Sequence, residues 1–162
     1  MSLDKRKVLI AGTYDPITTG HEDIIRRAAE MFDEVYVSVV KNDSKNPVFT
    51  AEERVSLCEK VFDDNPKIKI IADDRLLSQV AETYGCGTIV KGLRNTNDFV
   101  YEYEHSQIYR GMTPSLETVF LPSRPELQHV SSTAVKAIVK LGGNAEAYVP
   151  KSIYNEVCKK IR

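Results

Sequence analysis

The chain lacks the features that mark several common classes of protein. Its longest apolar stretches, residues 35–40 and 68–72, are far too short to span a bilayer. No charged and then apolar leader precedes them, so we expect a cytoplasmic protein. The 3 cysteines, Cys58, Cys86 and Cys158, are widely spaced and form no C-x-x-C pair. Neither a disulfide framework nor a zinc site is therefore indicated.

An excess of charge of either sign is missing as well. The 22 lysines and arginines nearly balance 23 aspartates and glutamates, which leaves a formal net charge of −1 and a pI near 6.3. A protein that binds nucleic acid usually carries a broad basic surface that neutralises phosphates. Nucleic acid is thus not an expected partner, and any site for anions must be local.

The hydrophobic pattern that is present predicts an α/β fold. Five short β-branched runs alternate with longer segments of helical period: residues 8–11, 35–40, 68–71, 88–90 and 118–121. This alternation is typical of a parallel sheet with helices on both faces. With 162 residues, 42% of them hydrophobic, the chain can bury one core. We predict a single Rossmann-like domain over residues 1–162, with a five-stranded parallel sheet and a C-terminal helix; residues 1–3 are compatible with an expression-vector remnant.

Local signals mark the ends of three predicted helices. A T-x-x-E pattern beginning at Thr50 has the form of a capping box and predicts a helix to about Phe62. Gly142 is suited to the left-handed conformation that ends a helix over residues 131–141. Pro150 is suited to the first turn of a final helix.

A polar run, G-T-Y-D-P-I-T-T-G-H, follows the first predicted strand from Gly12 to His21 and leads into an amphipathic helix. In open parallel sheets, ligands bind beyond the carboxyl ends of the strands, where helix N-termini offer free amides to phosphate. The run matches neither the G-x-x-x-x-G-K-[ST] loop nor the G-x-G-x-x-G loop. A histidine at a helix start, taken alone, more often caps the helix or packs than takes part in chemistry.

The surrounding motif changes that interpretation. The run resembles the T-x-G-H signature of the nucleotidyltransferase superfamily, and after G-T-[FY]-D-P it is similar to the phosphopantetheine adenylyltransferase family. The resemblance continues over about residues 6–161. It implies transfer of the adenylyl group of ATP to 4′-phosphopantetheine, giving dephospho-coenzyme A and pyrophosphate, the penultimate step of coenzyme A biosynthesis. It also implies a homohexamer.

Three further motifs carry the resemblance. Residues 44–54, S-K-N-P-V-F-T-A-E-E-R, are similar to S-K-x-P-x-F-[TS]-x-E-E-R; outside a motif, a lysine in such a loop would be a solvated charge. Residues 91–102 resemble R-G-[LI]-R-x-x-x-D-[FY]-x-[YW]-E, although Lys91 replaces the first arginine and loses its fork of donors. Residues 130–136, V-S-S-T-A-V-K, resemble I-S-S-[ST]-x-[VI]-[RK], whose hydroxyls can cap a helix and donate to phosphate.

The resemblance implies a role for each motif. His21 and Lys45 would act at the transferring centre, Arg94 and the hydroxyl run would hold the triphosphate, and Lys91 would hold the acceptor. The residues implied to bind ATP are Gly12, Thr13, His21, Gly92, Leu93, Arg94, Glu102, Leu127, Gln128, His129, Val130, Ser131, Ser132 and Thr133. Those implied to bind 4′-phosphopantetheine are Thr13, shared between the two substrates, together with Lys45, Leu77 and Lys91.

Mg²⁺ is the expected cofactor, because it can offset the charge of two phosphate groups brought together. The sequence shows no dedicated carboxylate cage, which fits a metal bound mainly through substrate phosphates and water. His105 lies in a predicted helix with Tyr101, Tyr103 and Tyr109, and we interpret this stripe as core or subunit contact.

Three other functions stay open at this stage. Within the superfamily, the acceptor could be nicotinamide mononucleotide, or the donor could be CTP with an alcohol phosphate as the acceptor. A regulatory module that binds a nucleotide without catalysis is also compatible with the fold, because fold alone does not fix function.

Overall fold

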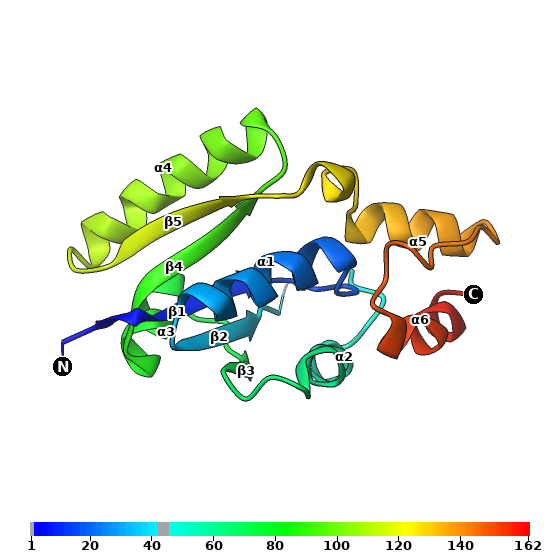
Figure 1. The fold of residues 1–162 in the computed structure, drawn as a ribbon, viewed down its shortest axis with the longest axis horizontal. Coiled ribbons are helices and arrows are strands. Elements are labelled where there is room, and N and C mark those ends of the chain that lie inside the picture. Colours follow the sequence, from blue (N-terminus) through cyan, green and yellow to red (C-terminus); the bar gives the residue numbers. More distant parts are fainter. Residues whose placement is uncertain (1, 42–45) are drawn as a thin grey trace.

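A computed structural model describes residues 2–41 and 46–162. Five parallel strands form one sheet in the order β3-β2-β1-β4-β5 (Figure 1). The strands are β1 (Asp4–Gly12), β2 (Glu34–Val39), β3 (Ile68–Ala72), β4 (Cys86–Leu93) and β5 (Glu117–Pro122). The predicted α/β fold with a five-stranded parallel sheet is confirmed. Each β-branched run lies within one strand, except that residues 35–40 extend one residue beyond the end of β2.

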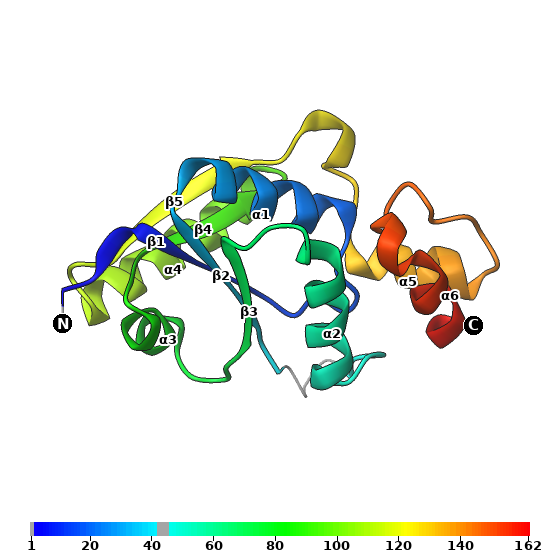
Figure 2. The same ribbon diagram turned by 60° about the horizontal axis from the view of Figure 1, so that its bottom comes forward.

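Helices connect the strands in a single domain. They are α1 (Thr19–Met31), α2 (Ala51–Phe62), α3 (Leu77–Tyr84), α4 (Thr96–Met112), α5 (Ser132–Lys140) and α6 (Tyr154–Ile161), with short 3-10 turns η2 (Pro125–Leu127) and η3 (Lys151–Ile153). Figure 2 shows α2 beside β3, and α5 and α6 together at one end of the molecule. Among the described residues, none of these helices is long and apolar enough to cross a membrane.

The two faces of the sheet bury separate apolar clusters. In β1, Val8 and Ile10 point into the larger cluster with Ile25 and the side chains of α2, whereas Leu9 points into a smaller cluster with side chains of α3. The alternation follows from the two-residue period of a strand. The sheet is therefore covered on both faces, as the sequence predicts.

Cap residues explain where the helices begin. Thr50 and Glu53 form the predicted capping box at the start of α2, which ends at Phe62. Ser131 caps α5, and Gly142 follows that helix with a φ of 77°. The prediction for the last helix was early by a few residues, because Pro150 starts a 3-10 turn and α6 begins only at Tyr154.

The strand order creates a crevice between β1 and β4. The chain moves outward from β1 to β2 and β3, and then returns to the other side of β1 to form β4 and β5. The connections that follow β1 and β4 consequently run in opposite directions from the carboxyl ends of these two strands. Ligands usually bind at such a point in an open parallel sheet. The polar run at residues 12–21 and the K-G-L-R segment at residues 91–94, where β4 ends, lie at this point.

Candidate active site

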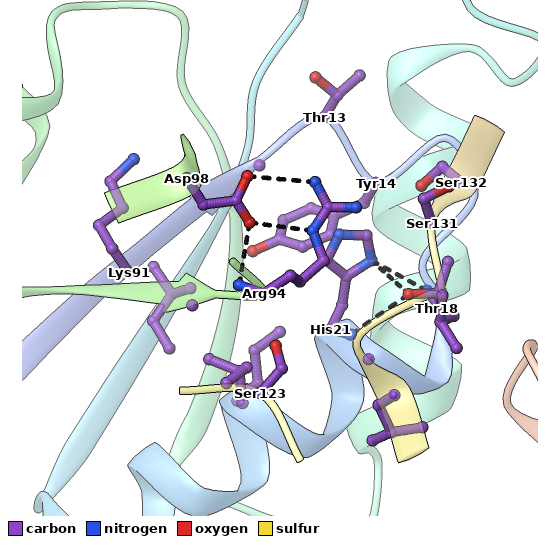
Figure 3. Close-up of a pocket in the computed structure, with 18 of the residues that line it drawn as sticks. Thr13, Tyr14, Thr18, His21, Lys91, Arg94, Asp98, Ser123, Ser131 and Ser132 are labelled. Carbon is purple, nitrogen blue, oxygen red and sulfur yellow. Dashed lines mark hydrogen bonds and ion pairs between the residues drawn. The ribbon is translucent and has the colours of Figure 1, made fainter. Parts of the chain in front are cut away.

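A cavity of about 400 Å³ opens at the carboxyl ends of β1 and β4. Its wall also includes residues from the first two turns of α1, α4 and α5, and Figure 3 labels several of them, among them His21, Asp98 and Ser132. A volume of this size is in the range of small-molecule sites. The wall brings together most of the residues singled out by the motifs: Gly12, Thr13, His21, Lys91, Gly92, Arg94, Glu102, Leu127, Val130, Ser131, Ser132 and Thr133.

Four predicted binding residues are not among those lining this cavity. Leu93 is the last residue of β4, next to two residues that do line it. Gln128 and His129 are exposed, and the ring of His129 packs edge-on against Tyr148 at 5.4 Å. Leu77 packs against the smaller apolar cluster under α3. Lys45, predicted to be catalytic and to bind the acceptor, lies outside the described residues.

Contacts at the start of α1 determine which ring nitrogen of His21 carries the proton. Thr18 is the N-cap residue, and its side chain accepts a hydrogen bond from the backbone amide of His21. In return, His21 Nδ1 accepts the backbone amide of Thr18 at 3.1 Å, and Thr18 Oγ1 lies 3.0 Å from the same nitrogen. A nitrogen that accepts an amide proton cannot carry its own, so the neutral ring has its proton on Nε2. His21 thus presents an N–H donor to a ligand.

The surroundings keep this imidazole neutral. Burial, with a smaller contribution from the charge of Arg94, lowers the pKa of His21 to about 4. Figure 3 shows the two side chains next to each other in the cavity, with the ring of Tyr14 behind them. Tyr14 meets His21 edge-on at 5.1 Å and restricts the orientation of its ring. Through the neutral pH range, His21 is a hydrogen-bond donor and carries no net charge.

Arg94 is held by a carboxylate from the first turn of α4. Its Nε lies 3.1 Å from Asp98 Oδ2 and its Nη2 lies 3.4 Å from Asp98 Oδ1. The backbone amide of Arg94 also donates to Asp98 Oδ2 at 3.0 Å. The arginine side chain remains 43% exposed, so its other donors can reach a ligand.

Lys91 pairs with the next carboxylate along α4. Its Nζ lies 3.1 Å from Glu102 Oε2, and both side chains are mostly buried. Within the described part of the chain, Glu102 Oε2 has no hydrogen-bond partner of good geometry. The two groups are therefore close enough to form an ion pair. Glu102 Oε2 can still accept a hydrogen bond from a hydroxyl or amide group of a ligand.

Two members of the hydroxyl run are engaged within the protein. Ser131 Oγ accepts the amide of Ala134 as the N-cap of α5, which leaves its own proton free. Ser132 Oγ donates to the carbonyl oxygen of Pro16 at 2.8 Å. Thr133 is exposed. The three hydroxyls are therefore not equivalent, because the proton of Ser132 already ties α5 to the loop after β1.

Asp15 fixes the same loop from the other side. Its buried carboxylate accepts the amides of Val48 and Phe49, at 3.1 and 2.9 Å, and the ammonium group of Lys136 of α5 at 2.8 Å. Burial raises the pKa of Asp15, but Lys136 and the two amides outweigh that effect and hold the pKa below its usual value. Asp15 therefore links the loop after β1 to α5, which also lines the cavity, and to the segment that precedes α2.

Arg54 is a functional candidate that the sequence reasoning missed. Its side chain is 1% exposed and lies in α2, outside the cavity wall. It donates to the carbonyl oxygens of Thr13 and Val40, each at 2.7 Å, and of Phe49 at 3.2 Å. The only sequence signal for it is the arginine of the E-E-R motif, whose partners cannot be read from the sequence.

Close packing accounts for two glycines of the motifs. A Cβ atom at Gly12 would lie 2.8 Å from the ring of Tyr14, which is too close for any side chain. A Cβ atom at Gly92 would lie 3.1 Å from Ile24 of α1. The absence of a side chain at Gly92 therefore lets β4 pack closely against α1.

Three carboxylates of the described residues line the cavity, and each is paired with a cation. Asp15 pairs with Lys136, Asp98 with Arg94 and Glu102 with Lys91. Over residues 2–41 and 46–162, histidine, cysteine, aspartate and glutamate side chains do not gather in groups of three that could hold a metal ion.

Comparison with known proteins identifies the class of the molecule. Residues 9–138 match the model of the cytidylyltransferase-like family. The fold resembles the solved structure of a bifunctional NMN adenylyltransferase/ADP ribose pyrophosphatase from Francisella tularensis, with a TM-score of 0.70 over 94% of this chain and 48% of that chain. The sequence identity is only 16%, so this likeness concerns the fold alone.

Relatives found by sequence identify a narrower family than the fold does. The phosphopantetheine adenylyltransferase of Lactobacillus johnsonii is 41% identical over 96% of this chain and 95% of its own. The protein of the same name from Methylobacillus flagellatus is 36% identical over 98% of this chain and 99% of its own. The chain therefore belongs to the phosphopantetheine adenylyltransferase family within the cytidylyltransferase-like proteins.

Proposed function

We propose that this enzyme transfers the adenylyl group of ATP to 4′-phosphopantetheine, forming dephospho-coenzyme A and pyrophosphate. The observation that carries the proposal is the 41% identity to a phosphopantetheine adenylyltransferase over nearly the whole chain. The geometry of the cavity agrees, because His21 and Arg94 lie side by side and can only donate hydrogen bonds to a ligand. Two such donors favour an anionic oxygen, as on a phosphate.

In the proposed reaction, a phosphate oxygen of the acceptor attacks the α-phosphorus of ATP. The new P–O bond forms as the bond from the α-phosphorus to the bridging oxygen breaks, and pyrophosphate leaves with that electron pair. The enzyme forms no covalent intermediate, so its task is to position the substrates and stabilise charge. His21 would donate from Nε2 to an oxygen of the α-phosphoryl group, while Arg94 and the free hydroxyls of the α5 start would hold the triphosphate.

The acceptor side is proposed from the family motifs. Lys91 and Lys45 would bind the phosphate of 4′-phosphopantetheine, and Thr13 would bond both substrates from the end of β1. Leu77 would contact the pantetheine arm. Lys91 is also the cation that faces Glu102, which the resemblance implies to bind ATP, so bound ATP and a bound acceptor phosphate would meet at one ion pair.

Mg²⁺ is the proposed cofactor. When bound, it would neutralise part of the charge of the phosphates that are brought together. The three cavity carboxylates already pair with cations, so the ion would be held mainly by substrate oxygens and water. This arrangement suits a metal that arrives with ATP.

One assay tests the proposed activity. Purified protein, ATP, Mg²⁺ and 4′-phosphopantetheine are expected to yield dephospho-coenzyme A and pyrophosphate in equal amounts, and excess chelator is expected to abolish the reaction. Nicotinamide mononucleotide as acceptor, and CTP with an alcohol phosphate, serve as comparisons. Faster turnover of either alternative would overturn the proposed substrates. Binding of ATP without turnover of any acceptor would instead favour a regulatory module.

The unequal hydroxyls give a second test. Thr133→Val keeps the shape of the side chain and removes an exposed hydroxyl, so it is expected to weaken ATP binding by up to about ten-fold with an unchanged melting temperature. Ser132→Ala frees the Pro16 carbonyl and is expected to lower the melting temperature as well. Calorimetric titration with ATP and with 4′-phosphopantetheine separates these effects. Equal losses for both ligands in Thr133→Val would show that the hydroxyl run does not serve the triphosphate.

The surface of α4 supports the proposed homohexamer. Ser106 is the only buried side chain among the described residues of α4, and large apolar side chains on the helix are exposed: Phe99, Val100, Tyr101, Tyr103, Ile108 and Met112. His105 stacks on Tyr101 at 4.1 Å on this surface. A cluster of exposed apolar side chains on a helix is typical of a subunit contact.

The proposed location is the cytoplasm, which suits three free, buried thiols.

A further inference from the structure

The Arg94–Asp98 pair has a geometry that leaves the arginine available for a ligand. Asp98 occupies the side edge of the guanidinium group, formed by Nε and Nη2. A guanidinium group has five N–H donors, and only two of them are used by this contact. The end edge, formed by Nη1 and the second proton of Nη2, stays free to bind a phosphate with two hydrogen bonds.

Asp98 is itself fixed by its place in the helix. It is the third residue of α4, and its backbone amide donates to the N-cap side chain of Asn95 at 2.9 Å. Its Oδ2 accepts the Arg94 backbone amide as well as Nε, so the carboxylate binds main chain and side chain of the same residue. Asp98 is 24% exposed, whereas Arg94 is 43% exposed. The more buried partner thus holds the more exposed one.

We propose that Asp98 is a positioning residue, which orders Arg94 so that its end edge faces the triphosphate of ATP. This inference rests on the proposed function and adds a residue to it. Without Asp98, Arg94 would be free to adopt several rotamers in the unliganded protein. Ordering a long side chain on binding costs affinity, so the effect should appear in ATP binding and not in acceptor binding. If Asp98 only stabilised the start of α4, its replacement would lower the stability of the protein and would affect the binding of both ligands equally.

Asp98→Asn removes the charge and keeps the size of the side chain. Its dissociation constant for ATP with Mg²⁺, measured by calorimetry, is expected to rise roughly two- to ten-fold, with that for 4′-phosphopantetheine unchanged. Asp64→Asn is the matched control, because Asp64 also accepts two hydrogen bonds from an arginine, Arg26, but lies outside the cavity. The control is expected to bind ATP as the unaltered protein does.

A double-mutant cycle decides whether Asp98 acts through Arg94. In the Arg94→Ala background, Asp98→Asn is expected to have almost no further effect on ATP binding. An equal loss in both backgrounds would overturn the proposal and leave Asp98 with only a structural role in the first turn of α4. Tighter ATP binding by Asp98→Asn would also overturn it, since Asp98 would then compete with phosphate for Arg94.

The binding measurement separates this proposal from the proposed function. If the unaltered protein binds ATP but forms no dephospho-coenzyme A, the proposed reaction fails, while the cycle still tests how Arg94 is held. If the reaction proceeds and the cycle shows no coupling, the assignment of Asp98 fails alone. Melting temperatures of all variants show whether α4 remains folded.

Discussion

Replacing His21 by alanine is expected to lower turnover by about 10²- to 10³-fold, with the Michaelis constants for both substrates within a few fold of their original values. A preorganised donor aimed at an oxygen that gains charge in the transition state is typically worth this much. The ground-state phosphates are held by other groups, so binding changes little. Single-turnover measurements give the rate of the chemical step directly.

The protonation of His21 sharpens this test. Its pKa of about 4 keeps the ring neutral, so no part of the pH–rate profile in the neutral range should arise from its titration. His21→Gln or His21→Asn can donate without titrating and is expected to recover part of the rate. Because Nδ1 also caps α1, His21→Ala should lower the melting temperature as well. A lowered melting temperature with a nearly normal rate would remove His21 from the mechanism.

Replacing Asp15 by alanine is expected to reduce the free energy of unfolding by about 3 kcal/mol. The change leaves Lys136 without its carboxylate and leaves two amides, of Val48 and Phe49, without their acceptor. Lys136 is 29% exposed and Asp15 only 5%, so the change leaves an ammonium group that water reaches only in part, which is costly. Urea denaturation followed by circular dichroism measures the loss.

An exposed ion pair provides the control for this prediction. Lys60 and Glu156 are close together but about half exposed, so Glu156→Ala should cost less than about 1 kcal/mol. The pKa of Asp15 is lowered on folding, so its contribution is present above the ordinary pKa of an aspartate and is lost as the pH falls through the lowered value. The prediction fails if Asp15→Ala costs no more than Glu156→Ala at neutral pH.

The sequence predicts the elements of this fold well where the signals are local. The capping box at Thr50 and the glycine after α5 place the helix ends within a residue or two, because cap and partner are neighbours in the chain. The start of α6 was placed less well, because a proline suits a 3-10 turn as readily as the first turn of an α-helix.

The site was predicted in part for the same reason. His21 and Arg94 could be found from short motifs, and the contact of Thr18 with His21 could have been read from the T-x-G-H spacing as a capping box. The partners of Asp15 lie 33, 34 and 121 positions away, and nothing in a single sequence joins them. The proton of Ser132 is likewise directed by Pro16, 116 residues away.

The position of Arg54 bears on how variants of this enzyme should be interpreted. One guanidinium group holds the carbonyl oxygens of three segments, at Thr13, Val40 and Phe49, although the arginine itself is buried in α2. Lysine has a single ammonium group and cannot span these three acceptors in the same way. A conservative exchange there would shift the Thr13 loop and impair activity from outside the cavity. Inherited or selected changes at Arg54 would thus resemble active-site lesions in a growth assay, although Arg54 lies outside the cavity wall.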